Sequence, residues 1–120
     1  MKPYIVKFVS EQSLAGKTTV LASVIAELKQ RGYVVAVVKH CAHGIDLEDK
    51  DSHRFIYSGA DVVVASSSNI GIVYYRRWVD SLDSIARVID APIIVVEGFK
   101  ESKIGDTVVV AEKLSGAVKL

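Results

Sequence analysis

The sequence Gly-Lys-Thr-Thr at residues 16–19 follows a predicted strand and a loop and opens a predicted helix. This order of elements constrains the fold more than any other feature of the sequence. The preceding segment, residues 4–10, is mostly apolar and β-branched, which is typical of a strand. Residues 17–31 repeat apolar side chains at helical spacing and end before Gly32, a residue type that commonly ends helices. A strand, a loop and a helix in this order form the usual context of a phosphate-binding loop.

The rest of the chain continues the alternation of strands and helices. We predict strands at 33–38, 62–65, 70–74, 92–96 and 107–111, a helix at 80–89, and a short helix capped by Ser52 that ends near Gly59. This order predicts an α/β fold with right-handed crossovers. The segment 33–38 is apolar on both faces, which predicts a strand inside a parallel sheet, and segment 70–74 predicts an antiparallel pair at one edge.

Length and composition set the class of protein. The chain has 120 residues, of which 50% are hydrophobic, so we expect one domain over residues 1–120 and exclude intrinsic disorder. Its net charge of +1 gives no general attraction to nucleic acid or to an anionic membrane. The single Cys41, with no signal peptide expected and no apolar run long enough to cross a bilayer, predicts a cytoplasmic protein.

The loop before the first helix has the chemistry to hold phosphate and Mg²⁺. Backbone N–H groups at a helix N-terminus point at an anion, and the helix dipole favours it. Lys17 would bridge the terminal phosphates, and the Thr18 hydroxyl would bind Mg²⁺. The alternative is a turn in which this sequence only opens a helix. The predicted binding residues are Ser13, Leu14, Ala15, Gly16, Lys17, Thr18 and Thr19.

Glu11 stands where the phosphate-binding pattern has its first glycine. A carboxylate ~6 Å from a phosphate charge costs roughly 3 kcal/mol at an effective dielectric constant of ~20. That cost corresponds to about a hundredfold in affinity. We therefore expect Glu11 to point away, to pair with a cation, or to weaken binding.

Phosphate chemistry also needs a carboxylate beyond the loop, to hold Mg²⁺ or to orient water. Glu97 closes the strand at 92–96, and strand carboxyl ends line the ligand crevice of such sheets. Asp46, in the loop after the second strand, is the other candidate. For Glu97 the alternative is an ordinary surface carboxylate at a strand end.

The loop after the second strand carries His40, Cys41 and His43, which are residue types that bind metal ions. No second cluster completes a tetrahedral set, so a structural zinc site is not expected. We expect a polar loop that reaches over the phosphates, with solvated histidines as the alternative.

Residues 74–78, Tyr-Tyr-Arg-Arg-Trp, join aromatic rings to two arginines. Such a group is able to stack on a flat heterocycle or to anchor a partner protein. The alternative is a strand end with exposed basic residues.

Several motifs follow one another in an order that resembles the MobB family, the molybdopterin-guanine dinucleotide biosynthesis proteins B. After Gly-Lys-Thr-Thr come Lys-His-x-x-His-x-x-Asp at residues 39–46, Lys-Asp-Ser at 50–52 and Val-Glu-Gly-Phe-Lys at 96–100. The resemblance covers residues 4 to about 105. It implies a three-layer, P-loop NTPase-like domain that binds GTP and Mg²⁺, forms a homodimer, and acts beside the MobA-like guanylyltransferase that attaches GMP to molybdopterin.

The resemblance also implies roles for single residues. Thr18, Asp46 and Glu97 would bind the metal, Asp46 and Glu97 would act in a slow hydrolysis of GTP, and His40 and His43 would belong to the nucleotide site. The chain departs from the family at Glu11, in a shortened loop after Asp46, and in ending early. Two alternatives stay open: a non-hydrolysing dimeric adapter for molybdopterin and the transferase, and a metallochaperone-like GTPase that uses His40, Cys41 and His43.

Overall fold

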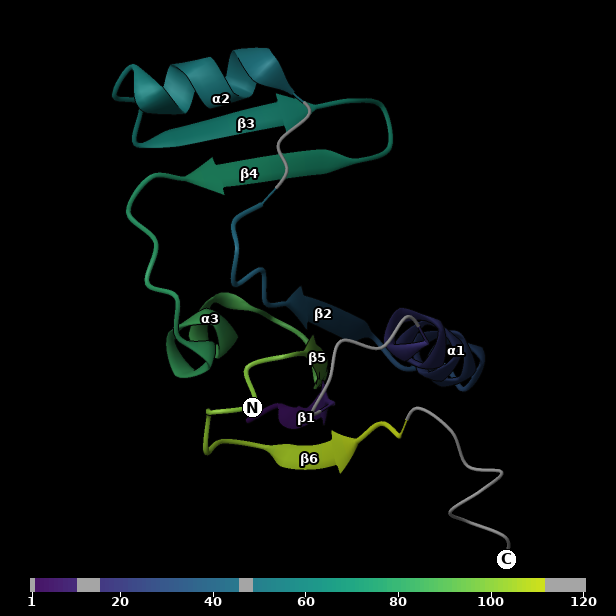
Figure 1. Cartoon of the computed structure of the whole chain (residues 1–120). Coiled ribbons are helices and arrows are strands. Elements are labelled where there is room, and N and C mark those ends of the chain that lie inside the picture. The colour runs from purple at the N-terminus through teal and green to yellow at the C-terminus, as the bar shows by residue number, and fades with distance from the viewer. Residues whose placement is uncertain (1, 11–15, 46–48, 112–120) are drawn as a thin grey trace, which may run out of the picture. The chain divides into compact units, whose positions relative to one another are not determined.

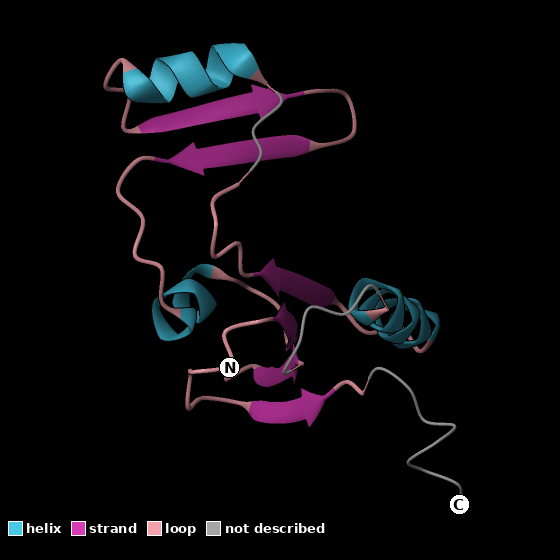
Figure 2. Cartoon of the chain, viewed as in Figure 1, coloured by secondary structure: helices cyan, strands magenta, loops and turns pink. Residues whose placement is uncertain are grey.

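The structure is a computed structural model that describes residues 2–10, 16–45 and 49–111. The chain divides into two compact units: the first comprises Met1–His40 and Ser81–Leu120, and the second comprises Cys41–Asp80. The elements, shown in Figures 1 and 2, are β1 (Tyr4–Val9), α1 (Lys17–Gln30), β2 (Val35–Lys39), α2 (Lys50–Tyr57), β3 (Val62–Ser66), β4 (Gly71–Tyr75), α3 (Leu82–Val88), β5 (Ile93–Glu97) and β6 (Asp106–Val109). None of the helices in the described ranges has the length and apolarity of a membrane span.

The first unit is built on a four-stranded parallel sheet in the order β2-β5-β1-β6. β5 and β1 are therefore the inner strands, and β2 lies at an edge. The prediction that β2 runs inside the sheet was wrong, and Val37 in this strand is 49% exposed. The apolar composition of β2 reflects the partial burial of its side chains on both faces of the sheet. It does not indicate whether the strand has a neighbour on one side or on both.

Successive side chains of β5 face opposite sides of the sheet, as in any strand. Ile94 and Val96 pack with Leu82 and Ile85 of α3, and Val95 packs with Phe8 and Leu21 from the side of α1. The three β5 residues Ile94, Val95 and Val96 are fully buried. The two helices therefore cover opposite faces of the sheet, which confirms the predicted three layers in this unit.

Helix α1 ends in a hydrogen-bonded glycine turn, as Gly32 indicated. The N–H of Gly32 donates to the carbonyl of Lys29 at 3.0 Å, and the N–H of Tyr33 donates to that of Leu28 at 3.1 Å. Gly32 has φ +90°, a value that suits glycine because it has no Cβ. This turn directs the chain from α1 into β2.

The second unit is an antiparallel pair, β3–β4, with α2 against it. The predicted antiparallel pair is present, but it forms a two-stranded sheet of its own rather than the edge of the parallel sheet. The predicted cap of α2 was also misplaced. Asp49, not Ser52, caps this helix: its carboxylate accepts from the Ser52 N–H at 3.3 Å and from the Ser52 hydroxyl at 2.6 Å. These hydrogen bonds, the hydroxyl's first, lower the pKa of Asp49.

Candidate functional site

The candidate site lies at the carboxyl ends of three neighbouring strands in the first unit. Glu97, the last residue of β5, is in register with Phe8 of β1 on one side and with Lys39 of β2 on the other. The connections that leave these strands therefore start at the same end of the sheet, which we call its carboxyl edge. This edge is where ligands bind in open α/β sheets.

Glu97 and Thr18 meet at this edge. The Thr18 hydroxyl donates to Glu97 Oε2 at 3.0 Å. The sheet register explains the contact, because Glu97 shares its face with Phe8, and Phe8 packs against Leu21 of α1. The structure thus brings together two residues that are 79 positions apart in sequence, and both had been predicted as Mg²⁺ ligands.

The geometry of this pair fits a magnesium ion. Mg²⁺ takes oxygen ligands in octahedral geometry at about 2.0–2.1 Å, so two adjacent ligands lie about 3 Å apart. Thr18 Oγ1 and Glu97 Oε2 have that spacing, at 3.0 Å. A hydroxyl and a carboxylate are also the oxygen types that this ion accepts.

The N-terminus of α1 carries neither a side-chain cap on its N-cap residue, Gly16, nor an acidic side chain in its first turn. Gly16 has φ −80°, so backbone strain does not require glycine there. No heavy atom of the described residues comes within 4 Å of a Cβ placed on Gly16. Neither strain nor crowding by the described residues therefore requires glycine at this position.

His40 lies next to Glu97 at the same edge. The N–H of His40 donates to the Glu97 carbonyl at 2.9 Å, and its imidazole stacks on the Phe99 ring with centroids 4.0 Å apart. Gly98 makes this approach feasible: it has φ +97°, and a Cβ there would come within 3.0 Å of His40 Cβ. The sequence Glu-Gly-Phe therefore turns the chain at the end of β5 and places an aromatic ring against His40.

The structure also describes Lys17, Thr19 and His43. Lys17 begins α1 and is half-buried, Thr19 is exposed beside it, and His43 is exposed in the second unit. Glu11, Ser13, Leu14, Ala15 and Asp46 lie outside the described residues. Within the described ranges, which include His40, Cys41 and His43, no group of three or more His, Cys, Asp or Glu residues is arranged to hold a metal ion.

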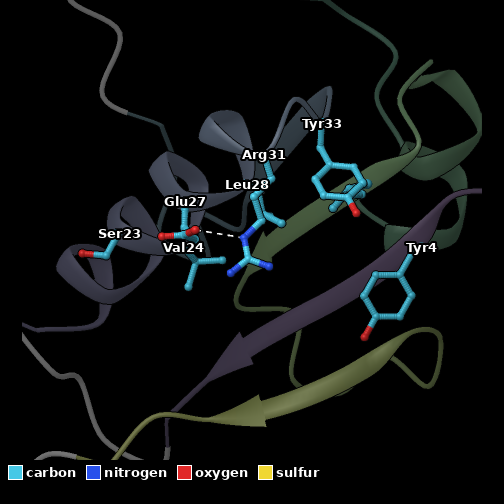
Figure 3. Close-up of a pocket in the computed structure, with 8 residues that line it drawn as sticks. Tyr4, Ser23, Val24, Glu27, Leu28, Arg31 and Tyr33 are labelled. Carbon is cyan, nitrogen blue, oxygen red and sulfur yellow. Dashed lines mark hydrogen bonds and ion pairs between the residues drawn. The ribbon is translucent and has the colours of Figure 1, made fainter.

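A pocket of about 540 Å³ lies at the other edge of the same unit (Figure 3). Its residues come from the start of β1 and β5 and from the carboxyl-terminal half of α1. In Figure 3 the Arg31 guanidinium points to Glu27, with which it pairs at 2.9 Å. Tyr4 donates to Asp106 at 2.7 Å, and this hydrogen bond raises the pKa of Tyr4. The lining residues are Tyr4, Ser23, Val24, Glu27, Leu28, Arg31, Tyr33 and Ile93.

The aromatic residues after β4 also interact. Tyr75 and Trp78 stack with ring centroids 6.0 Å apart and an interplanar angle of 20°. Both side chains are about half exposed, at 55% and 50%. These residues therefore form an exposed strand end, with Arg76 and Arg77 beside the rings, and binding of a heterocycle or a partner protein there stays a prediction.

The family is decided by a match over nearly the whole chain. The model of the MobB family, molybdopterin guanine dinucleotide synthesis protein B, matches residues 5–119. The chain belongs to the MobB family. Two proteins called molybdopterin-guanine dinucleotide biosynthesis adapter protein are similar to it: that of Haemophilus influenzae is 36% identical over 96 residues, and that of Escherichia coli is 33% identical over 101.

These MobB relatives are longer than the chain. The aligned regions take in 75% and 78% of this chain but 54% and 58% of the relatives, so the chain spans little more than half of their length. Among solved structures, Bacillus subtilis MobB aligns with a TM-score of 0.71 at 25% identity, covering 92% of this chain and 69% of that one. A second MobB structure aligns at 0.67 with 32% identity, covering 89% and 70%. The MobB resemblance and the α/β fold inferred from the sequence are thus confirmed.

Sequence reasoning gave no separate role to Lys7 and Phe99, two residues connected to the candidate site. Phe99 was quoted only as part of a motif, and its stacking on His40 depends on the turn at Gly98. Lys7 was predicted only as one residue of the first strand. The structure shows that its side chain is buried, with an exposed fraction of 2%. A lysine inside an apolar strand sequence was the available signal for Lys7.

Proposed function

We propose that the protein is a GTP-binding adapter of molybdopterin guanine dinucleotide biosynthesis. The observation that carries the proposal is the Thr18–Glu97 pair beside the uncapped N-terminus of α1. A cation position and an anion position side by side suit a nucleoside triphosphate with Mg²⁺. The names of the relatives, adapter proteins of this biosynthesis, support the pathway.

In this proposal each residue of the site has a separate task. The N–H groups at the start of α1 and the Lys17 ammonium bind the phosphates, since both are positive donors. Thr18 and Glu97 hold Mg²⁺, which neutralises the charge that develops on the phosphates. Glu97, or Asp46, orients water, and we propose that hydrolysis is slow. Ser13, Leu14, Ala15, Thr19, His40 and His43 remain predicted contacts of the nucleotide.

Calorimetry with GTP and Mg²⁺ tests this function. We expect GTP to bind below millimolar concentration with Mg²⁺, and Glu97→Gln to reduce the Mg²⁺-dependent gain in affinity by about tenfold or more, since one charged ligand is lost. Glu101→Gln is the matched control, because Glu101 is an exposed carboxylate on the same connection. No binding of GTP to the wild-type protein, or a Glu97→Gln variant with unchanged Mg²⁺ dependence, would contradict the proposal.

The proposed partners follow from the adapter role. They are molybdopterin and the MobA-like guanylyltransferase that attaches GMP to it, in the cytoplasm. We also propose a homodimer. One face of the β3–β4 pair supports it, because Val62, Val64, Val73 and Tyr75 share that face in register and are 49–61% exposed. An apolar surface of this kind is typical of an interface.

Sedimentation tests the dimer and its surface. We expect a wild-type dimer, and we expect Val64→Asp to shift the protein to monomer, because a carboxylate would be buried without a partner in the interface. Val88→Asp is the control, since Val88 is 71% exposed on α3 in the first unit. A Val64→Asp variant that still sediments as a dimer would show that another surface forms the contact.

A further inference from the structure

Lys7 is a buried lysine in the middle of the parallel sheet. It is 2% exposed, and its neighbours in register are Val96 of β5, which is fully buried, and Thr107 of β6. Its Nζ donates to the carbonyl oxygen of Ser102. Burying an ammonium group is costly unless it is hydrogen-bonded. The hydrogen bond from Lys7 therefore fixes the position of the Ser102 carbonyl.

Ser102 closes the turn that follows the candidate site. Its N–H donates to the Phe99 carbonyl at 2.9 Å, and its hydroxyl accepts from the Ile104 N–H at 3.4 Å. The bond to Lys7 thus fixes the far end of a turn that starts at Phe99. The near end is fixed as well, because the Gly98 N–H donates to the Phe8 carbonyl at 3.1 Å.

Phe99 needs this support. Its φ is +54°, a left-handed conformation that is unusual for a bulky residue and persists only where the surroundings impose it. The imposed conformation has a visible result: the Phe99 ring stacks on His40 with an interplanar angle of 26°. His40 in turn is bonded through its backbone to Glu97.

We propose that Lys7 is a positioning residue of the candidate nucleotide site. Its ammonium fixes the Phe99–Ser102 turn, and the turn holds the Phe99 ring against His40 beside Glu97. That the ligand of this site is GTP rests on the proposed function. The connection from Lys7 to His40 does not depend on that identity, because every contact in it lies within the first unit and needs no ligand.

Lys7→Met tests the connection, since methionine fills a similar volume and carries no charge. A well-packed apolar residue often replaces a buried charge without loss of stability, so we expect the variant to fold. In the nucleotide-free wild-type protein, stacking on Phe99 should shift the His40 imidazole protons upfield in NMR spectra. We expect Lys7→Met to lose this shift and to bind GTP about tenfold more weakly, by analogy with groups that orient metal-binding side chains.

Lys103→Met is the matched control, because Lys103 is an exposed lysine on the same connection. An unchanged His40 shift in folded Lys7→Met would overturn the proposal. Should that variant fail to fold, the wild-type protein decides: a slowly exchanging Lys7 ammonium with scalar coupling to the Ser102 carbonyl supports the proposal, and a rapidly exchanging ammonium overturns it. GTP that fails to bind the wild-type protein would overturn the proposed function alone, since the imidazole shift is measured without nucleotide.

Discussion

Replacing Lys17 by alanine is expected to lower the affinity for GTP with Mg²⁺ by about a hundredfold, or ~2.7 kcal/mol. Hydrogen bonds to charged groups contribute ~1.5–3 kcal/mol each, and Lys17 would donate to phosphates that carry several charges. Lys17 is the first residue of α1 and is half-buried, and no residue of the core clusters is replaced. The melting temperature should therefore change little. Calorimetry and thermal unfolding on the same samples measure both quantities.

Lys29→Ala is the matched control for Lys17→Ala, since it removes a lysine from the other end of the same helix. Lys29 donates to the Tyr33 carbonyl at 2.8 Å, so this change affects only the end of α1. We expect GTP affinity to stay within about twofold. A Lys17→Ala protein that is unfolded would show that Lys17 is structural, and one that binds GTP normally would place the phosphates elsewhere.

Gly105→Ala is expected to have the largest effect on stability, lowering the free energy of unfolding by about 3 kcal/mol. Gly105 precedes β6 and has φ +77°. A Cβ at this position would lie 2.7 Å from the Ile5 carbonyl oxygen and 2.8 Å from Ile5 Cγ2. The nearest atom is a backbone oxygen, which cannot turn away as a side chain can. The clash is therefore relieved only by moving β1 or β6. Urea unfolding followed by circular dichroism measures the loss.

Gly32→Ala separates the clash from the backbone strain. Gly32 has φ +90°, but no heavy atom of the described residues would lie within 4 Å of a Cβ at this position, so only the left-handed conformation is penalised. We expect a loss of about 1 kcal/mol. Equal losses for the two variants would contradict the packing of Gly105 against Ile5.

Local patterns were enough to predict most elements of the first unit. Helical spacing identified α1 and α3, and continuous β-branched segments identified β1 and β5, because each pattern reports burial of one segment. The site pair was predictable for a related reason. Thr18 follows a loop motif, Glu97 ends a buried strand, and α/β topology brings helix starts and strand carboxyl ends together.

Features that depend on contacts between distant segments or on unusual backbone conformation were not predictable from such patterns. β2 is apolar but is an outer strand of the sheet. The crossover connections, rather than the residues of β2, determine which strands pair with it. The stacking of Phe99 on His40 requires two consecutive positive φ values, at Gly98 and Phe99, and the second is not a glycine. The role of Lys7 depends on a carbonyl 95 residues away.

The hydrogen bond between Thr18 and Glu97 has a consequence for the Mg²⁺ binding that we propose at this pair. Both oxygens already stand at the separation of adjacent ligands, 3.0 Å, and only the hydroxyl hydrogen lies between them. Rotation of the Thr18 hydroxyl about its Cβ–Oγ1 bond therefore turns the hydrogen away from Glu97 without movement of α1 or β5. The two proposed ligands already have the separation that Mg²⁺ requires, so we expect the ion to bind without a rearrangement of the backbone.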